Sequence, residues 1–427
     1  KATGRNVAAL VDLQGPKIRC GWFKKNADGE DKVQLTEGQE FVITTDDIEG
    51  DEHITSTTFK GLPGDCHAGD PILIDDGKVR LEVTKVEGNN VYTKVVVAGP
   101  VSSHKGINLP GVINSDRLLA VPTWNYDRIV IMGGGVIGVE FATIFQALCS
   151  KVTIVEKGPH LLGPMDEEVS EALKEQLVKK GITVYCNAMV EEIQREEGLV
   201  CTVRHLLTDE TTQIKTNQVV VAVGRAPYTE GLLGEDMSLQ IEHGRPVVNA
   251  DFETSEPGIY AIGDVSAKTQ LAHVAMAQAT YVIENLAGKP HTIRLEAVPN
   301  GMFVSLPIVP SCIYTEPEIA TVGLTEAKAG ELGMKVRCGV YDMGENGKSI
   351  IAREEHGFIR LIFEAYSNTI VGAQMMCPRA TDMIGEMATA IANGLTAEQL
   401  SLAMRAHPTY SEGIAAAIED AMRQNEK

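Results

Sequence analysis

Residues 133–138, "GGGVIG", place glycines at the spacing G-x-G-x-x-G, which occurs once in the 427 residues. The loop follows the apolar run 128–132 and opens an apolar stretch from 136 to 148, the order of strand, turn and helix. In such a turn Gly133 bends the chain tightly, Gly135 lets the backbone approach a pyrophosphate, and Gly138 permits close helix packing. The spacing therefore predicts a dinucleotide-binding loop.

An acidic residue stands where the ribose of such a dinucleotide is expected. A second strand, residues 151–155, ends in Glu156, 18 residues after Gly138, and an acid at this point binds the ribose hydroxyls of the adenosine. Because a carboxylate repels a 2′-phosphate and no arginine cluster follows, the sequence favours NAD over NADP. A glycine cluster without this strand, helix and acid would indicate only a turn.

Composition excludes several classes of partner. The chain is 44% hydrophobic and 22% charged with a net charge of -20, which argues against nucleic acid or an anionic membrane as partner. No apolar run approaches the ~20 residues of a membrane span, and the first residues lack a secretory signal. We expect about three domains in a cytoplasmic protein.

Eight cysteines are spread so widely that the closest pair is 15 residues apart. Neither C-x-x-C nor C-x-x-x-x-C occurs, so a redox disulfide within one turn or helix is excluded and zinc-ligand spacing is absent. We expect ordinary thiols in a reducing compartment and no metal site.

The pattern of elements changes twice along the chain. Short alternating strands with Gly, Asp and Asn turns fill the first ~112 residues, as in a small β-barrel or sandwich. From Tyr126 strands alternate with amphipathic helices such as 167–179, and after about Pro310 strands precede helices. Thr396 and Gln399 have the spacing of a capping box.

Residues 6–112 resemble the B domain of pyruvate kinase, the lid of that enzyme. The resemblance rests on "DLQGPKIR" at 12–19, "LIDDGKV" at 73–79 and "SSHKGINLPG" at 102–111. It implies a lid over nucleotide phosphates with Asp75 and Lys105 nearest to them; an Asx turn and a solvated lysine are the alternative. The barrel with that enzyme's catalytic groups has no counterpart downstream, so phosphate transfer is not expected.

Residues 113–427 resemble a flavoprotein disulfide reductase, closest to dihydrolipoyl dehydrogenase. Six motifs occur in family order: "GGGVIGVEFA" from 133, "VVVAVGRAPYT" from 219, "TSEPGIYAIGDV" from 254, "LAHVAMAQA" from 271, "VPSCIYTEPEIATVG" from 309 and "AHPTYSEG" from 406. The resemblance implies a homodimer with NAD and FAD as cofactors. A small-molecule dithiol or a lipoyl domain is the implied substrate.

The same resemblance assigns the cofactor-binding residues. Asp264, after Gly263, would hold the ribityl chain of FAD, and Leu271, Ala272 and His273 would lie against the flavin. Glu140 would sit near the nicotinamide. Gly224, in the second motif, belongs with the cofactor-binding residues. In isolation Asp264 would indicate a helix cap and Glu140 an acid near a helix N-terminus.

His407 and Glu412 form an H-x-x-x-x-E pair around Pro408. A carboxylate bonded to one imidazole nitrogen fixes the tautomer, which suits a base that deprotonates a thiol. By resemblance this dyad is catalytic and acts across the dimer interface on the dithiol substrate.

Two family features do not occur in these residues: a first FAD loop and a C-x-x-x-x-C disulfide. We therefore expect an incomplete FAD site and an inactive chain, formed as a chimera with its seam near "LPGVINSDRLL". A non-catalytic, dimeric NAD-binding scaffold is one alternative, and a pyruvate kinase fragment is another.

The predicted fold is multidomain. It consists of a small β-barrel or sandwich at 1–112, a junction at 113–125, an α/β Rossmann-type NAD domain at 126–245, the C-terminal part of an FAD domain at 246–309 and an α+β dimerisation domain at 310–427.

Overall fold

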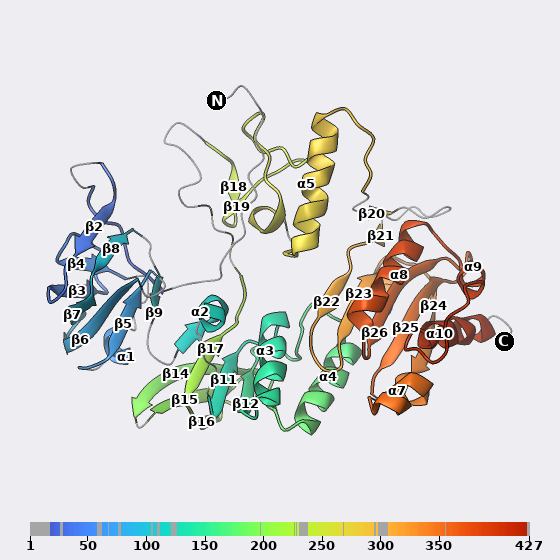
Figure 1. The fold of residues 1–427 in the computed structure, drawn as a ribbon, viewed down its shortest axis with the longest axis horizontal. Coiled ribbons are helices and arrows are strands. Elements are labelled where there is room, and N and C mark those ends of the chain that lie inside the picture. The colour runs from blue at the N-terminus through green and yellow to red at the C-terminus, as the bar shows by residue number, and fades with distance from the viewer. Residues whose placement is uncertain are drawn as a thin grey trace. The chain divides into compact units, whose positions relative to one another are not determined.

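The computed structural model describes residues 18–25, 29–57, 62–66, 68–75, 78–103, 106–108, 112–120, 126–196, 198–225, 227, 229, 238–267, 269–293, 296–297, 306–354 and 356–424. They form two compact units, whose helices and strands are labelled in Figure 1. One unit takes its described residues from 15–163 and 173–225, and the other from 164–172 and 226–427. Within these described ranges, no helix is long and apolar enough to cross a membrane.

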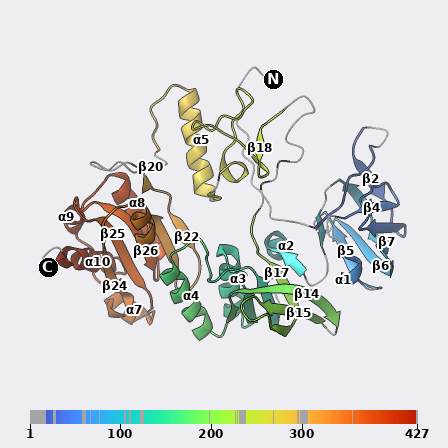
Figure 2. The ribbon, with the colours of Figure 1, turned by 180° about the vertical axis from the view of Figure 1, so that it is seen from behind.

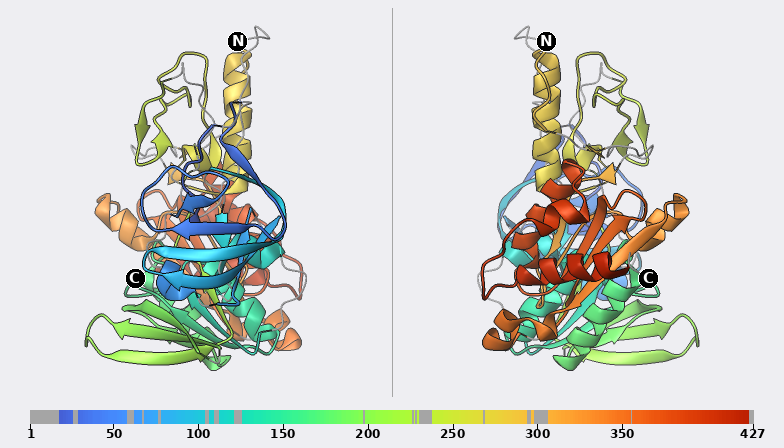
Figure 3. Two further views of the ribbon diagram at one scale, coloured as in Figure 1. Left: turned by 90° about the vertical axis from the view of Figure 1, so that its left-hand side faces the viewer. Right: turned by 90° about the vertical axis from the view of Figure 1, so that its right-hand side faces the viewer.

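Strands make up the first part of one unit, residues 18–108. A seven-stranded sheet has the order β1-β9-β5-β6-β7-β3-β4, and β2 pairs with β8. Figure 3, left, shows this part of the chain in blue, facing the viewer. The alternating pattern explains these strands, because Val79, Leu81 and Val83 of β6 are buried while the residues between them are exposed. A bridge from Cys20 to Thr57 joins the two ends of the sheet. The elements are β1 (Ile18–Arg19), β2 (Lys32–Leu35), β3 (Glu40–Thr44), β4 (Ile54–Ser56), α1 (Leu62–Asp65), β5 (Pro71–Ile74), β6 (Val79–Glu87), β7 (Asn90–Val97), β8 (Gly99–Ser102) and β9 (Gly106–Asn108).

The rest of this unit is built on a parallel sheet of order β10-β17-β11-β12-β13. Helix α3 packs on β11 and β12 through a buried face that includes Val139, Ala142 and Phe145. An antiparallel sheet, β14-β15-β16, adjoins it. The elements are β10 (Val112–Asn114), α2 (Ser115–Ala120), β11 (Arg128–Met132), α3 (Val136–Ala147), β12 (Lys151–Val155), α4 (Glu167–Lys179, shared between the units), β13 (Thr183–Tyr185), β14 (Ala188–Glu196), β15 (Gly198–His205), β16 (Thr211–Thr216) and β17 (Gln218–Val221).

The second unit begins with short strands and one long helix. Gly263–Val265 form a 3-10 turn, η1, which packs against α5 (Ala272–Leu286). Figure 2 shows α5, in yellow, from behind. The remaining elements are β18 (Ile241–Glu242), β19 (Arg245–Pro246), β20 (Glu296–Ala297) and β21 (Leu306–Pro307).

The second unit ends in an antiparallel sheet of order β22-β23-β26-β25-β24. Helices α8 and α10 pack against it (Figure 3, right). Their apolar positions, such as Met387 and Ile418, enter one buried core with β25 and β26. The elements are β22 (Ser311–Ile313), β23 (Ile319–Gly323), α6 (Glu326–Glu331), β24 (Val336–Asp342), η2 (Met343–Glu345), α7 (Gly347–Ala352), β25 (Phe358–Glu364), β26 (Ile370–Met376), α8 (Ala380–Ala392), α9 (Ala397–Ser401) and α10 (Glu412–Arg423).

Several predicted elements are confirmed. The strand at 151–155 and the helix at 167–179 have the predicted bounds. Thr396 and Gln399 form the reciprocal capping box that opens α9. The segment 113–125, expected as a junction, contributes to the parallel sheet, because β10 pairs in register with β17.

Candidate functional site

The glycine loop joins β11 to α3 at the carboxyl edge of the parallel sheet. Gly133 adopts φ +107°, and a Cβ there would come within 2.4 Å of the carbonyl oxygen of Ala222. A Cβ at Gly138 would lie 2.0 Å from the carbonyl oxygen of Gly133. A Cβ at Gly135 would meet nothing within 4 Å. The first and third glycines therefore let the backbone pack closely, whereas the second leaves an open approach.

Both oxygens of Glu156 bind backbone amides. The N–H of Gly134 donates to Oε2 and the N–H of Gly158 donates to Oε1, each at 2.5 Å. This half-buried carboxylate therefore ties the glycine loop to the turn after β12. Sequence reasoning expected Glu156 at this edge, but it did not predict these bonds, because the two amides lie in separate turns.

The structure brings two further predicted residues to this part of the unit. Glu140, half-buried, lies one turn into α3. Gly224 follows β17 with φ +133° and is exposed. The backbone N–H of Ala222, two residues earlier, donates to the carbonyl of Met132, so the end of β17 lies beside the end of β11.

Gly263 and Asp264 form a tight turn in the second unit. Gly263 has φ +68°, its N–H donates to Oε1 of Gln278 at 2.8 Å, and a Cβ there would lie 2.9 Å from that of Ala275 in α5. Asp264 is 9% exposed, and Arg245 Nη1 donates to its carbonyl at 2.9 Å. The turn is thus held on both sides, with a carboxylate in its middle.

Residues 271–273 stand at the start of α5 in the same unit. Leu271 is the N-cap, without a side-chain cap, and Ala272 and His273 are exposed. The His273 ring donates from Nε2 to the carbonyl of Pro310 at 2.8 Å. The helix N-terminus therefore presents backbone amides, which favour negative charge.

The His407–Glu412 pair has the predicted geometry. Nδ1 of His407 donates to Oε1 of Glu412 at 2.9 Å, and Oε2 of Glu412 accepts from the backbone N–H of Thr409 at 2.8 Å. Those two bonds, the amide first, lower the pKa of Glu412 below its ordinary value. The proton is thereby placed on Nδ1, which leaves Nε2 of the exposed imidazole as the acceptor.

Neighbouring residues that sequence reasoning missed hold this turn. Arg405, whose side chain is 7% exposed, pairs with Glu386 at 2.5 Å. Asn346 Nδ2 donates to the carbonyl of Thr409 at 3.1 Å, and Tyr410 donates its hydroxyl proton to Glu354. All of these contacts are distant in sequence, and no local pattern indicates them.

Of the two candidate residues in the N-terminal segment, the structure describes only Asp75. Oδ2 of Asp75 forms an ion pair with Nζ of Lys78 at 2.9 Å. Lys105 lies outside the described residues. Within the described ranges, no group of three His, Cys, Asp or Glu side chains is arranged to hold a metal ion.

Two family matches cover most of the chain. Residues 65–279 match the family "Pyridine nucleotide-disulphide oxidoreductase", and residues 309–418 match its dimerisation domain. A dihydrolipoyl dehydrogenase of Chlorobaculum tepidum is 36% identical over 69% of this chain and 61% of its own length. One of Geobacillus stearothermophilus is 31% identical over 85% of this chain and 76% of its own length.

Solved structures share this fold. The HOCl-induced flavoprotein disulfide reductase RclA from Escherichia coli aligns with a TM-score of 0.64 at 25% identity, over 74% of this chain and 68% of that one. LpdA from Mycobacterium tuberculosis, at 21% identity and a TM-score of 0.64, supports the fold alone.

The family match begins at residue 65, inside the segment for which we expected a pyruvate kinase resemblance. The comparisons give no support to that second resemblance or to a chimera. The family matches confirm the expected Rossmann-like α/β domains and dimerisation domain.

Proposed function

The chain belongs to the pyridine nucleotide-disulphide oxidoreductase family, and from this premise we propose the reaction of dihydrolipoyl dehydrogenase. In it dihydrolipoamide and NAD+ give lipoamide, NADH and a proton. The observation that carries the proposal is the bond from His407 Nδ1 to Glu412, which leaves Nε2 to take a proton from a thiol of the substrate. The relatives named dihydrolipoyl dehydrogenase support this choice of dithiol.

NAD would bind at the glycine loop. The open space at Gly135 fits a pyrophosphate, and the N-terminus of α3 would favour its charge. Glu156 supports NAD over NADP because a carboxylate there repels a 2′-phosphate. Glu140 and Gly224 would lie near the nicotinamide half.

FAD would be held by Asp264 and by residues 271–273, with Gly263 giving the tight turn. When bound, FAD supplies the two-electron step between the dithiol and NAD. The 427 residues contain neither a second G-x-G-x-x-G loop nor a C-x-x-x-x-C pair. We therefore propose that this polypeptide alone has an incomplete FAD site and does not turn over.

The match at residues 309–418 supports a homodimer in which each copy presents His407 to the other. The substrate would be a small dithiol or a lipoyl domain, and the compartment the cytoplasm.

For residues 1–112 we propose a β-barrel, supported by the Cys20–Thr57 bridge, which joins the ends of the seven-stranded sheet around its own buried core. The likeness to the pyruvate kinase lid rests on the three sequence motifs alone. Formation of ATP from phosphoenolpyruvate and ADP would favour the phosphotransferase alternative.

The test uses the purified 427-residue protein. We expect saturable quenching of NADH fluorescence, less than one flavin per chain by absorbance at 450 nm, and no NAD+ reduction by dihydrolipoamide. Measurable NAD+ reduction would refute the proposed inactivity. No NADH binding would refute the assignment itself, whereas NADH binding without any flavin would favour a non-catalytic scaffold. His407→Gln should leave NADH binding unchanged.

A further inference from the structure

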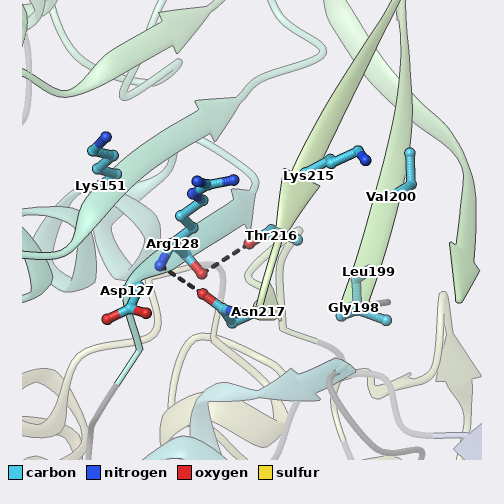
Figure 4. A pocket seen from close by; sticks show the side chains of 9 residues that line it. All are labelled: Asp127, Arg128, Lys151, Gly198, Leu199, Val200, Lys215, Thr216 and Asn217. Carbon is cyan, nitrogen blue, oxygen red and sulfur yellow. Dashed lines mark hydrogen bonds between the residues drawn. The ribbon is translucent and has the colours of Figure 1, made fainter. Parts of the chain in front are cut away.

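A pocket of about 460 Å³ lies in the first unit, away from the glycine loop. It is lined by the start of β11, the start of β12 and one end of the β15–β16 hairpin (Figure 4). Arg128 begins β11 and Gly133 follows its last residue, so the pocket and the loop stand at opposite ends of a five-residue strand, roughly 15 Å apart. The pocket is therefore separate from the proposed NAD site.

Hydrogen bonds fix the floor of the pocket. Arg128 donates its backbone N–H to Oδ1 of Asn217 at 3.0 Å, and its carbonyl accepts from the Thr216 hydroxyl at 2.9 Å (Figure 4). The N–H of Lys151 donates to the carbonyl of Asp127 at 2.8 Å. These bonds use backbone or short polar groups, so the long charged side chains above them take no part.

The charge of the pocket is opposite to that of the chain. Arg128, Lys151 and Lys215 line it against the single carboxylate of Asp127, in a protein of net charge -20. Figure 4 shows the three cationic side chains rising from three different strands. Among the residues that the structure describes, these three side chains have no ion-pair or hydrogen-bond partner.

Several features of the pocket suit a small anion. A volume of about 460 Å³ is in the range of small-molecule sites. The Arg128 guanidinium offers paired N–H donors for a phosphate or carboxylate, and the two lysines add positive charge. Because Oδ1 of Asn217 accepts the Arg128 N–H in the floor, the side-chain NH2 of Asn217 is the group that could donate to a ligand. Asp127 offers an acceptor for a hydroxyl.

We propose that this pocket binds a small hydroxylated oxyanion, whose phosphate or carboxylate lies among Arg128, Lys151 and Lys215. Phosphate and carboxylate ligands of this kind share a cluster of charged oxygens with an adjacent hydroxyl. Binding at this pocket requires neither a dinucleotide nor a flavin.

The experiment titrates the protein with glycerol 3-phosphate, inorganic phosphate or glutarate, at an ionic strength held constant with sodium chloride, and records the melting temperature. We expect a saturable rise with glycerol 3-phosphate. Lys215→Gln and Arg128→Gln should each weaken binding about tenfold, the loss of one charged hydrogen bond. Neither change touches the backbone bonds of the floor. A stronger response to glutarate, which carries no hydroxyl, than to either phosphate would overturn the hydroxyl part of the proposal and leave a carboxylate site.

Lys94→Gln, a charge-matched change at an exposed position on β7, should bind as the unchanged protein does. Equal binding by Lys94→Gln and Lys215→Gln would overturn the proposal, as would equal responses to all three anions and to chloride. NADH affinity should be the same in Lys215→Gln and the unchanged protein. A drop in that affinity would show that the pocket belongs to the nucleotide site.

Discussion

Gly138→Ala should destabilise the part of the chain for which NAD binding is proposed. The new Cβ would lie 2.0 Å from the carbonyl oxygen of Gly133, where ordinary contact begins at 3.4 Å. The obstacle is backbone at the end of β11, so no side-chain rotation relieves it and α3 must shift. Overpacking of this kind costs about 1–3 kcal/mol. In a unit of this size each kcal/mol lowers the melting temperature by about 2–4 °C.

Gly135→Ala is the matched control within the same loop. Its φ of −73° is one that alanine adopts, and a Cβ there meets nothing within 4 Å. Gly135 is the N-cap of α3, and alanine caps a helix less well than glycine, at a cost of about 1 kcal/mol. We expect a smaller loss of melting temperature than for Gly138→Ala but NADH affinity weaker by about tenfold or more, because the methyl group occupies the space expected for the pyrophosphate.

The melting temperatures of Gly138→Ala and Gly135→Ala are measured by calorimetry, and their NADH affinities by fluorescence titration. The reasoning fails for Gly138 if the alanine variant melts at the temperature of the unchanged protein. It fails for Gly135 if the variant keeps full NADH affinity. A variant at Gly135 that loses as much stability as Gly138→Ala, together with NADH affinity, would mean that the open space beside this glycine is needed for the fold and not for a ligand.

Three further predictions concern acidic residues. Glu156→Gln should lower stability by about 1–2 kcal/mol, because the amide NH2 faces a backbone donor; chemical denaturation of the variant checks this. Glu412 has a lowered pKa when folded, so the stability it adds is present above about pH 4.5 and is lost as pH falls further; the melting temperatures of Glu412→Gln and the unchanged protein should converge there. Glu386→Ala should leave Arg405 buried without its partner and cost about 1–3 kcal/mol, seen as a lower melting temperature.

Local chemistry explains what could be predicted from the sequence. The strand before Gly133, the strand that ends at Glu156 and the capping box at Thr396 depend on neighbours within a few residues, and short-range patterns describe such neighbours well. The hydrogen-bond partner of His407, Glu412, is also near in sequence. These parts of the site were predicted for that reason.

Long-range pairing explains what could not be predicted. β10 joins the parallel sheet through β17, more than a hundred residues later, so residues 113–125 looked like a junction when taken alone. The pocket at Arg128 is formed by four strands, β11, β12, β15 and β16, which only the fold brings together. No periodicity in one segment contains that information.

The exposure of His407 bears on the proposed dimer. Its side chain is 77% exposed while Glu412, at 32%, is held by an amide. A base in open water gains nothing over solvent, since proton transfer to a bound thiol needs a positioned partner within hydrogen-bond reach. Within its own unit the described residues hold the Nδ1 side of this imidazole and leave the Nε2 side open. A second copy that covers this face would position the dithiol against Nε2, so the exposure favours a base that acts on its partner's site.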